Sequence, residues 1–226
     1  MSTSSSAPII FYPPGACSLS CMVVADWVGE PYELCRVERE VRSSDAFKRI
    51  NPRAQVPALR VGDRTLVEAG AILVHLAERR PSSNLLPPAG TAERDTLNQW
   101  LSYFGSGFHV SFYPFFMPGR YIKDPTLHGA VKDAAIDQIR AQLAHVDRQL
   151  SGQSYVLGEA RSVLDPYLYA MSRWAVSLVD MPREYPNVAA HQERMQKDAA
   201  VQFVLATERG EAATSASGAC RGHVML

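Results

Sequence analysis

One stretch of the chain, Asn51–Leu59, constrains the fold more than any other. Pro52 and Pro57 flank a short polar loop, and an apolar alternation typical of a strand begins directly after the second proline. Proline cannot donate a hydrogen bond to a sheet, so it belongs at the start of a strand, and in a tight turn the Val56–Pro57 bond is a candidate cis peptide. The backbone of Val56 is then free to pair with a peptide-like ligand. The alternative is a trans proline that only shapes a turn.

A second stretch combines a strand, a sharp turn and the start of a helix. Ile9–Tyr12 is a short apolar strand, Pro13-Pro14-Gly15 must turn, and a helix is predicted over Ser18–Val28. Cys17 therefore lies at the positive end of a helix, where free backbone N–H groups lower the pKa of a thiol. The alternatives are a small packing role for Cys17 and a simple helix cap for Ser18.

The rest of the first third alternates between strands and helices. The pattern predicts a strand over Tyr32–Val37, a short helix from Ser43 to Ile50, a hairpin of Leu59–Val61 with Arg64–Val67, and a helix over Ala69–Arg80. The resulting order β-α-β-α-β-β-α is that of a thioredoxin-like α/β layer.

After residue 90 the strand signals nearly vanish. A helical pattern over 91–116 contains Gly105, Gly107 and Pro114, which we expect to bend or break it, and an apolar stripe over 127–150 predicts one long helix. Ser162 and Asp165 have the spacing of a helix capping box. We therefore predict a flexible N-terminus (1–8), an α/β domain (9–80), a linker (81–90), an all-α domain (91–209) and a flexible tail (210–226).

Composition narrows the choice of partner. The 23 Lys and Arg residues balance 23 Asp and Glu residues, so the formal charge of zero predicts no nucleic-acid or anionic membrane partner. No run of about 20 apolar residues is present, and the Ser-rich start lacks the apolar core of a signal peptide, so we expect a cytoplasmic protein. The four cysteines have no zinc-binding spacing, and no metal is predicted. Cys17 and Cys21, four residues apart, leave a redox pair as an alternative.

The motif Tyr12-Pro-Pro-Gly-Ala-Cys17-Ser-Leu-Ser20, together with the Val56–Pro57 stretch, resembles the glutathione transferases, and most closely the bacterial beta class. The resemblance covers Ile9 to about Arg209. It implies a thioredoxin-like glutathione-binding domain followed by an all-α domain, glutathione as co-substrate, no metal and a homodimer. Cys21-Met22 replaces the usual Pro-His, and the lysine expected after the second strand has only Arg42 and Lys48 as candidates.

The resemblance also implies roles at the thiol of glutathione. Cys17 looks like the beta-class cysteine, which contacts glutathione and can form a mixed disulfide with it. Ser18 is a second catalytic candidate, and Tyr12 looks like the first-strand tyrosine that other classes use as a donor to the thiolate. Which of the three activates the thiol stays open.

The remaining glutathione contacts are implied in the same way. Gln55, Val56 and Pro57 would pair with the cysteinyl unit, and Glu68 would bind the γ-glutamyl amine. Many classes place Ser after this Glu, whereas this chain has Ala69, so only a main-chain donor remains for the carboxylate. The alternative for Glu68 is an ordinary acidic residue at a helix start.

The second substrate is expected between the two halves, against the helical one. By resemblance its pocket would contain His109, Tyr113, Tyr167 and Trp174. Aromatic residues at helical spacing are also typical of a core, and that alternative stays open.

The sequence thus predicts a glutathione transferase, an enzyme of detoxification type that joins the glutathione thiolate to hydrophobic electrophiles. One alternative is a glutathione-dependent thiol–disulfide reductase, isomerase or dehalogenase that uses Cys17 itself. Another is a non-enzymatic scaffold that binds a partner protein.

Overall fold

The computed structural model describes residues 7–226, which form two compact units. The sheet unit contains the residues up to Leu86 together with Met195–Leu226, and the helical unit is Pro87–Arg194. The predicted flexible N-terminus lies outside the described residues except for Ala7 and Pro8. The carbonyl of Pro8 accepts a hydrogen bond from the N–H of Glu33 at 2.8 Å.

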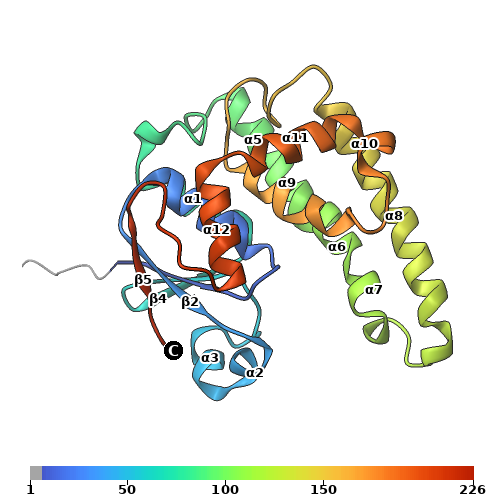
Figure 1. Cartoon of the computed structure of the whole chain (residues 1–226), viewed down its shortest axis with the longest axis horizontal. Helices are drawn as coiled ribbons and strands as arrows, with labels where there is room; N and C mark the ends of the chain where they lie inside the picture. Colours follow the sequence, from blue (N-terminus) through green and yellow to red (C-terminus); the bar gives the residue numbers. More distant parts are fainter. Residues whose placement is uncertain (1–6) are drawn as a thin grey trace, which may run out of the picture. The chain divides into compact units, whose positions relative to one another are not determined.

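The sheet unit has the predicted order of elements, with one additional short helix, α2, before the predicted helix that ends at Ile50. The elements are β1 (Ile9–Tyr12), α1 (Ser18–Val28), β2 (Tyr32–Arg36), α2 (Arg39–Ser43), α3 (Asp45–Ile50), β3 (Ala58–Val61), β4 (Arg64–Val67), α4 (Ala69–Glu78) and the 3₁₀ turn η1 (Pro81–Ser83), with α12 (Ala199–Arg209) and β5 (Cys220–His223) added from the end of the chain. The strand order is β4-β3-β1-β2-β5. In Figure 1 the red segment that contains β5 lies beside β2. β1 is parallel to β2 and antiparallel to β3, and β4 closes the hairpin with β3. The thioredoxin-like fold is confirmed.

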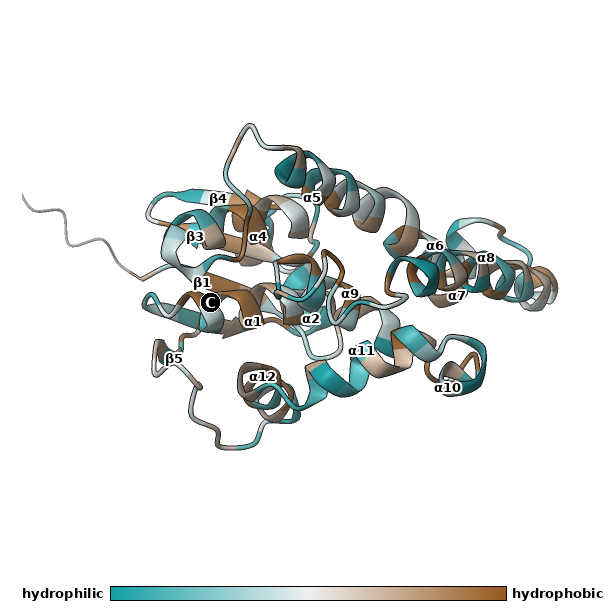
Figure 2. Cartoon of the chain, turned by 90° about the horizontal axis from the view of Figure 1, so that it is seen from above, coloured by the Kyte–Doolittle hydropathy of each residue, from teal (hydrophilic) through white to brown (hydrophobic). Residues whose placement is uncertain are grey.

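The core of the sheet unit explains the apolar run of β1. All four of its residues are buried, as expected for a central strand that is covered on both faces. On one face Ile9 and Phe11 pack with Phe47 of α3, and the two phenylalanine rings are 5.7 Å apart. The helices α1 and α4 pack against each other and against β1 and β3. Figure 2 shows the hydrophobic colour concentrated on β1, α1 and α4.

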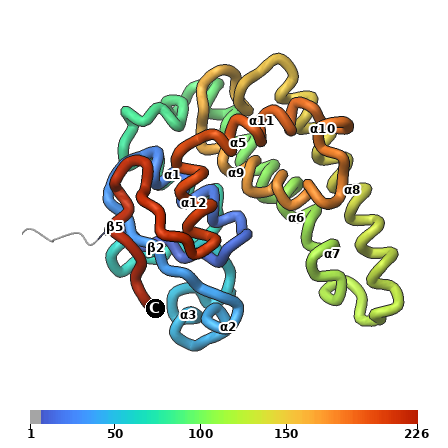
Figure 3. Tube along the Cα trace, viewed as in Figure 1, coloured from blue at the N-terminus to red at the C-terminus, as the bar shows by residue number. Residues whose placement is uncertain are grey.

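The end of the chain corrects two predictions. Residues 210–226, expected as a flexible tail, contain β5, which pairs in parallel with β2 (Figure 3). Asp26 of α1 anchors this segment, because its carboxylate accepts bonds from Ser217 Oγ at 2.8 Å and from Tyr32 Oη at 3.2 Å. The helix α12, predicted within the all-α domain, belongs to the sheet unit, where Trp27 Nε1 donates to Asp198 Oδ1 at 3.0 Å.

The helical unit follows the predicted pattern, and the helical stretch over 91–116 is divided into several segments. Its elements are α5 (Ala92–Tyr103), the π-helical turn η2 (Phe104–Phe108), α6 (His109–Ser111), α7 (Tyr113–Phe116), the 3₁₀ turns η3 (Pro118–Arg120) and η4 (Pro125–Leu127), α8 (His128–Gln149), α9 (Leu164–Ser172), the 3₁₀ turn η5 (Arg173–Ala175), α10 (Met181–Glu184) and α11 (Pro186–Gln196), whose last two residues fall in the sheet unit. Gly105 and Gly107, expected to bend or break the helix, lie in the π-helical turn η2, and Pro114 lies in the first turn of the separate helix α7.

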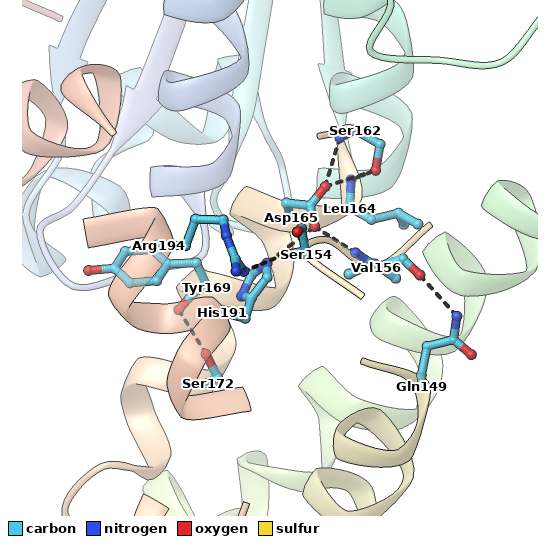
Figure 4. Close-up of polar contacts among 10 residues, drawn as sticks. All are labelled: Gln149, Ser154, Val156, Ser162, Leu164, Asp165, Tyr169, Ser172, His191 and Arg194. Atoms are coloured by element: carbon cyan, nitrogen blue, oxygen red, sulfur yellow. Dashed lines mark hydrogen bonds and ion pairs between the residues drawn. The ribbon is translucent and has the colours of Figure 1, made fainter. Parts of the chain in front are cut away.

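The capping box at the start of α9 is confirmed. Ser162 Oγ accepts from Leu164 N, and the buried Asp165 carboxylate accepts from Ser162 N at 2.7 Å. The same carboxylate accepts from Val156 N at 2.9 Å and contacts His191 Nε2 at 3.2 Å. Figure 4 shows Asp165 at the centre of these contacts, which tie the loop before α9 to α11.

Candidate functional site

The two stretches that the sequence singled out meet in the sheet unit. Cys17 occupies the N-cap of α1 and is only 4% exposed. Its Sγ lies 3.9 Å from the carbonyl oxygen of Val56, and the Val56–Pro57 peptide is cis, as predicted. A thiol at a positive helix end therefore lies beside the backbone of the cis-proline loop.

The turn that leads to Cys17 is held by a residue from the other end of the chain. Gly15 N donates to Glu208 Oε1 of α12 at 3.1 Å, and Glu208 is almost fully buried. Arg36 Nη1 donates to the Glu208 carbonyl at 3.3 Å. Sequence reasoning missed Glu208, because no local spacing connects it to a turn 193 residues away.

The two other candidates for activating the thiol have different surroundings. Ser18 is fully buried, and within the described part of the chain its Oγ has no hydrogen-bond partner, so the bond expected of the alternative role, a simple helix cap, is not made. The hydroxyl of Tyr12 lies 3.0 Å from His223 Nε2 of β5, and burial raises the pKa of Tyr12 to about 12. Of the three, Cys17 is the residue that contacts Val56.

The cis-proline loop is fixed by a buried asparagine. Asn51 Nδ2 donates to the carbonyl of Gln55 at 2.8 Å, and Asn51 Oδ1 accepts from Arg53 N at 3.1 Å. Between them Ala54 has φ +54°, a left-handed conformation that L-residues other than glycine adopt at a cost. The Asn51 side chain thus positions Gln55 and, with it, the backbone of Val56.

Glu68 and Ala69 begin α4, as predicted. Glu68 is the N-cap residue with φ +68°, and Ala69 is the buried first residue of the helix. Arg53 Nη1 lies 2.9 Å from Glu68 Oε1, and the two side chains are 64% and 67% exposed. The exposed carboxylate and the helix N-terminus suit a ligand that carries both an amine and a carboxylate.

The candidates for the missing lysine lie in α2 and α3. Arg42 is partly buried, and its Nε has no hydrogen-bond partner among residues 7–226, whereas Lys48 is exposed. Neither is linked to Cys17 or Glu68 by a described contact.

Cys21 is a poor partner for Cys17. It is completely buried one turn further along α1, and burial together with the nearby Cys17 raises its pKa far above the ordinary value. A thiol that stays protonated is a weak nucleophile, so the redox-pair alternative is not favoured. Across the described residues no group of His, Cys, Asp or Glu side chains is arranged to hold a metal ion, and no helix is long and apolar enough to cross a membrane.

The four predicted second-substrate residues gather within the helical unit. His109 Nδ1 lies 3.2 Å from Tyr167 Oη, and the His109 ring packs 5.4 Å from Tyr113 and 5.2 Å from Trp174. Burial lowers the pKa of His109 to about 4, so its ring is neutral near pH 7. Phe112 and the half-exposed Phe116 extend this aromatic cluster through contacts with Trp174.

The sequence of this chain is similar to those of known glutathione S-transferases. Residues 10–78 match the family described as Glutathione S-transferase, N-terminal domain. Glutathione S-transferase GstA of Escherichia coli O157:H7 is 30% identical over 204 residues, which cover 88% of this chain and 98% of that protein.

Two solved structures are similar along almost their whole length. A sphingomonad glutathione S-transferase complexed with glutathione is 34% identical with a TM-score of 0.80, covering 89% of this chain and 98% of that one. A bacterial beta-class glutathione S-transferase of Sphingomonas chungbukensis is 33% identical with a TM-score of 0.79, covering 88% and 98%.

These relatives belong to a class of thiol-binding enzymes that combine a thioredoxin-like unit with a helical unit. This chain has the same two units, and its sheet unit holds a thiol beside a cis-proline loop. This chain is a member of the glutathione S-transferase family, similar to its bacterial beta class. The predicted family, enzyme class and glutathione co-substrate are confirmed at that level.

Proposed function

We propose that this enzyme binds glutathione at the sheet unit and transfers its thiolate to a hydrophobic electrophile held by the aromatic cluster of the helical unit. The observation that carries the proposal is the position of Cys17 Sγ, 3.9 Å from the Val56 carbonyl at the N-terminus of α1. The backbone of Val56 pairs with the cysteinyl unit of glutathione, which brings the glutathione sulfur to the positive end of the helix. The helix N–H groups stabilise the sulfur as a thiolate.

Both charged groups at the γ-glutamyl end of glutathione have a group of the matching kind at the start of α4. Glu68 receives the γ-glutamyl ammonium, and the N–H of Ala69 faces the adjacent carboxylate.

The cluster around His109 is neutral and aromatic, so it favours an apolar electrophile with a flat ring.

The test is a conjugation assay with glutathione and an aryl halide activated by nitro groups. We expect the wild type to form the thioether with release of halide, and Trp174→Ala to raise the KM for the aryl halide with little change in the KM for glutathione. No thioether formation above the uncatalysed rate with any of several electrophiles would contradict the proposal. Glu93→Gln, an exposed change on α5, serves as the control.

A second function, thiol–disulfide exchange, is favoured by a specific observation. Among the three candidates for activating the glutathione thiol, Cys17 is the one that contacts Val56, and its own thiol can act as a nucleophile. Its thiolate would attack the glutathione sulfur of a glutathionyl disulfide, form a mixed disulfide and release the other thiol. A second glutathione would then attack the mixed disulfide, giving oxidised glutathione and restoring Cys17.

Cys17→Ser separates the two functions. If conjugation is the main activity, the variant keeps it within about tenfold, because the helix N-terminus and the serine hydroxyl remain. If exchange is the main activity, the variant loses it entirely and no mixed disulfide is seen by mass spectrometry. The family resemblance further supports a cytoplasmic homodimer, which sedimentation and cell fractionation test.

A further inference from the structure

The ion pair between Arg53 and Glu68 contributes too little to folding stability for stability to explain why it is present. Arg53 Nη1 lies 2.9 Å from Glu68 Oε1, yet both side chains are about two-thirds exposed. Exposed pairs are screened by solvent and contribute little to folding stability. The pair joins the cis-proline loop to the start of α4, the two elements of the proposed glutathione site.

The backbone holds both residues firmly while their charged ends stay accessible. Arg53 N donates to Asn51 Oδ1 at 3.1 Å, and the carbonyl of Glu68 accepts the first helical bond, from Ile72 N at 3.0 Å. Glu68 adopts φ +68°, and Ala54 beside Arg53 adopts φ +54°. Non-glycine residues in this region persist where the surrounding structure imposes the conformation, often at ligand-binding sites.

The pair presents one positive and one negative charge side by side. The free end of a γ-glutamyl residue is an amino-acid zwitterion, with an ammonium and a carboxylate on one carbon atom. Such a ligand end can lie against the pair with its ammonium on Glu68 and its carboxylate on the Arg53 guanidinium, so that the four charges alternate. Guanidinium groups bind carboxylates through paired, charge-assisted hydrogen bonds.

We propose that Arg53 is a specificity-determining residue that binds the α-carboxylate of the γ-glutamyl unit, with Glu68 binding the α-ammonium. This inference rests on the proposed function. Ala69 at the first position of α4 has no hydroxyl to offer to that carboxylate, and Arg53 supplies the missing side-chain donor.

The test is calorimetric titration with three ligands. They are glutathione, an analogue that lacks the α-amino group of the γ-glutamyl unit, and an analogue that lacks its α-carboxylate. The proteins are the wild type, Arg53→Gln, Glu68→Gln and the control Arg79→Gln, which removes an exposed positive charge at the far end of α4. Thermal unfolding verifies that each variant is folded.

We expect Arg53→Gln to raise the Kd for glutathione about tenfold or more and to leave the Kd for the analogue without the carboxylate unchanged. Glu68→Gln should weaken glutathione binding and spare the analogue without the amine, and Arg79→Gln should change neither. An Arg53→Gln variant that binds glutathione as tightly as the wild type, or that loses affinity equally for both analogues, would overturn the inference. A wild type that binds none of the ligands would instead overturn the proposed function.

Discussion

His109 is the residue whose titration the structure predicts most directly. Burial lowers its pKa to about 4, whereas an unfolded chain has an ordinary histidine pKa near 6.5. Below about pH 6.5 the unfolded state therefore binds a proton that the folded state does not, and the free energy of unfolding falls as the pH drops toward 4.

Replacing His109 with glutamine should remove this contribution. We expect the free energy of unfolding of His109→Gln to fall less steeply than that of the wild type between pH 6.5 and 4, as measured by urea denaturation at several pH values. Parallel curves for the two proteins would mean that His109 is not buried as a neutral ring. His128→Gln, which changes a partly exposed histidine, is the control.

Ala54 offers a second prediction at this scale. Its left-handed φ of +54° costs about 1–2 kcal/mol for an L-residue, whereas glycine adopts it freely but loses about 0.5–1 kcal/mol of chain entropy on folding. Ala54→Gly should therefore stabilise the protein by about 0.5–1 kcal/mol in chemical denaturation. Ala46→Gly, in the helix α3, should destabilise it by about 1 kcal/mol. Destabilisation by both changes would refute the strain at Ala54.

At the scale of single elements, the start of α9 depends on Asp165. Its buried carboxylate accepts two backbone N–H groups and the Ser162 hydroxyl. In Asp165→Asn one carboxylate oxygen becomes an NH₂ that faces donors, so we expect a loss of about 3 kcal/mol in the free energy of unfolding. Asp137→Asn, an exposed change on α8, should cost less than about 0.5 kcal/mol. Equal free energies of unfolding for the two variants would show that the Ser162–Asp165 capping box does not stabilise the start of α9.

The strand β5 gives the second prediction for an element. A chain that ends at Glu211 loses the pairing with β2, the Ser217–Asp26 bonds and the contact between His223 and Tyr12. We expect it to be less stable by about 3 kcal/mol and to self-associate through the uncovered edge of β2, as seen by sedimentation.

Removing only Met225 and Leu226 is the matched control for that deletion. Met225 is almost fully exposed, and the last backbone bond of the segment, from Val224 N to the Leu34 carbonyl, is retained. A chain ending at Glu211 that matched this control in stability would show that residues 212–226 do not pack on the sheet.

The elements differ in how far the sequence could predict them. The bounds of β1 and α1 follow from the apolar run, the Pro-Pro-Gly turn and the glycine after Val28, all of which are local. β5 could not be predicted, because its residues, Cys-Arg-Gly-His, have no strand pattern. Its partner β2, and the Asp26 carboxylate that binds the preceding Ser217, lie about 190 residues away in sequence. Such a strand is stabilised by backbone pairing and by a buried acceptor rather than by its own apolar residues.

At the scale of the whole molecule, the candidate site also combines residues that local motifs reveal with residues that come from distant parts of the sequence. Cys17, Val56, Pro57 and Glu68 could be proposed as site residues from the sequence because each lies in a short motif with its own chemistry. Glu208 and His223, which contact Gly15 and Tyr12, reach the first strand and its turn from the end of the chain. Arg53 was within the motif but carried no signal by itself, since its pairing with Glu68 depends on the folded loop.

We propose that glutathione binds at the sheet unit with its amine on Glu68, and the activity of the whole enzyme depends on this binding. The measurement that tests it most directly is calorimetric titration of the full chain with glutathione, repeated with Glu68→Ala. We predict binding in the micromolar to low millimolar range that weakens about tenfold or more in the variant. An absence of heat and of any thermal shift with several millimolar glutathione, or equal affinity of the two proteins, would contradict this binding mode.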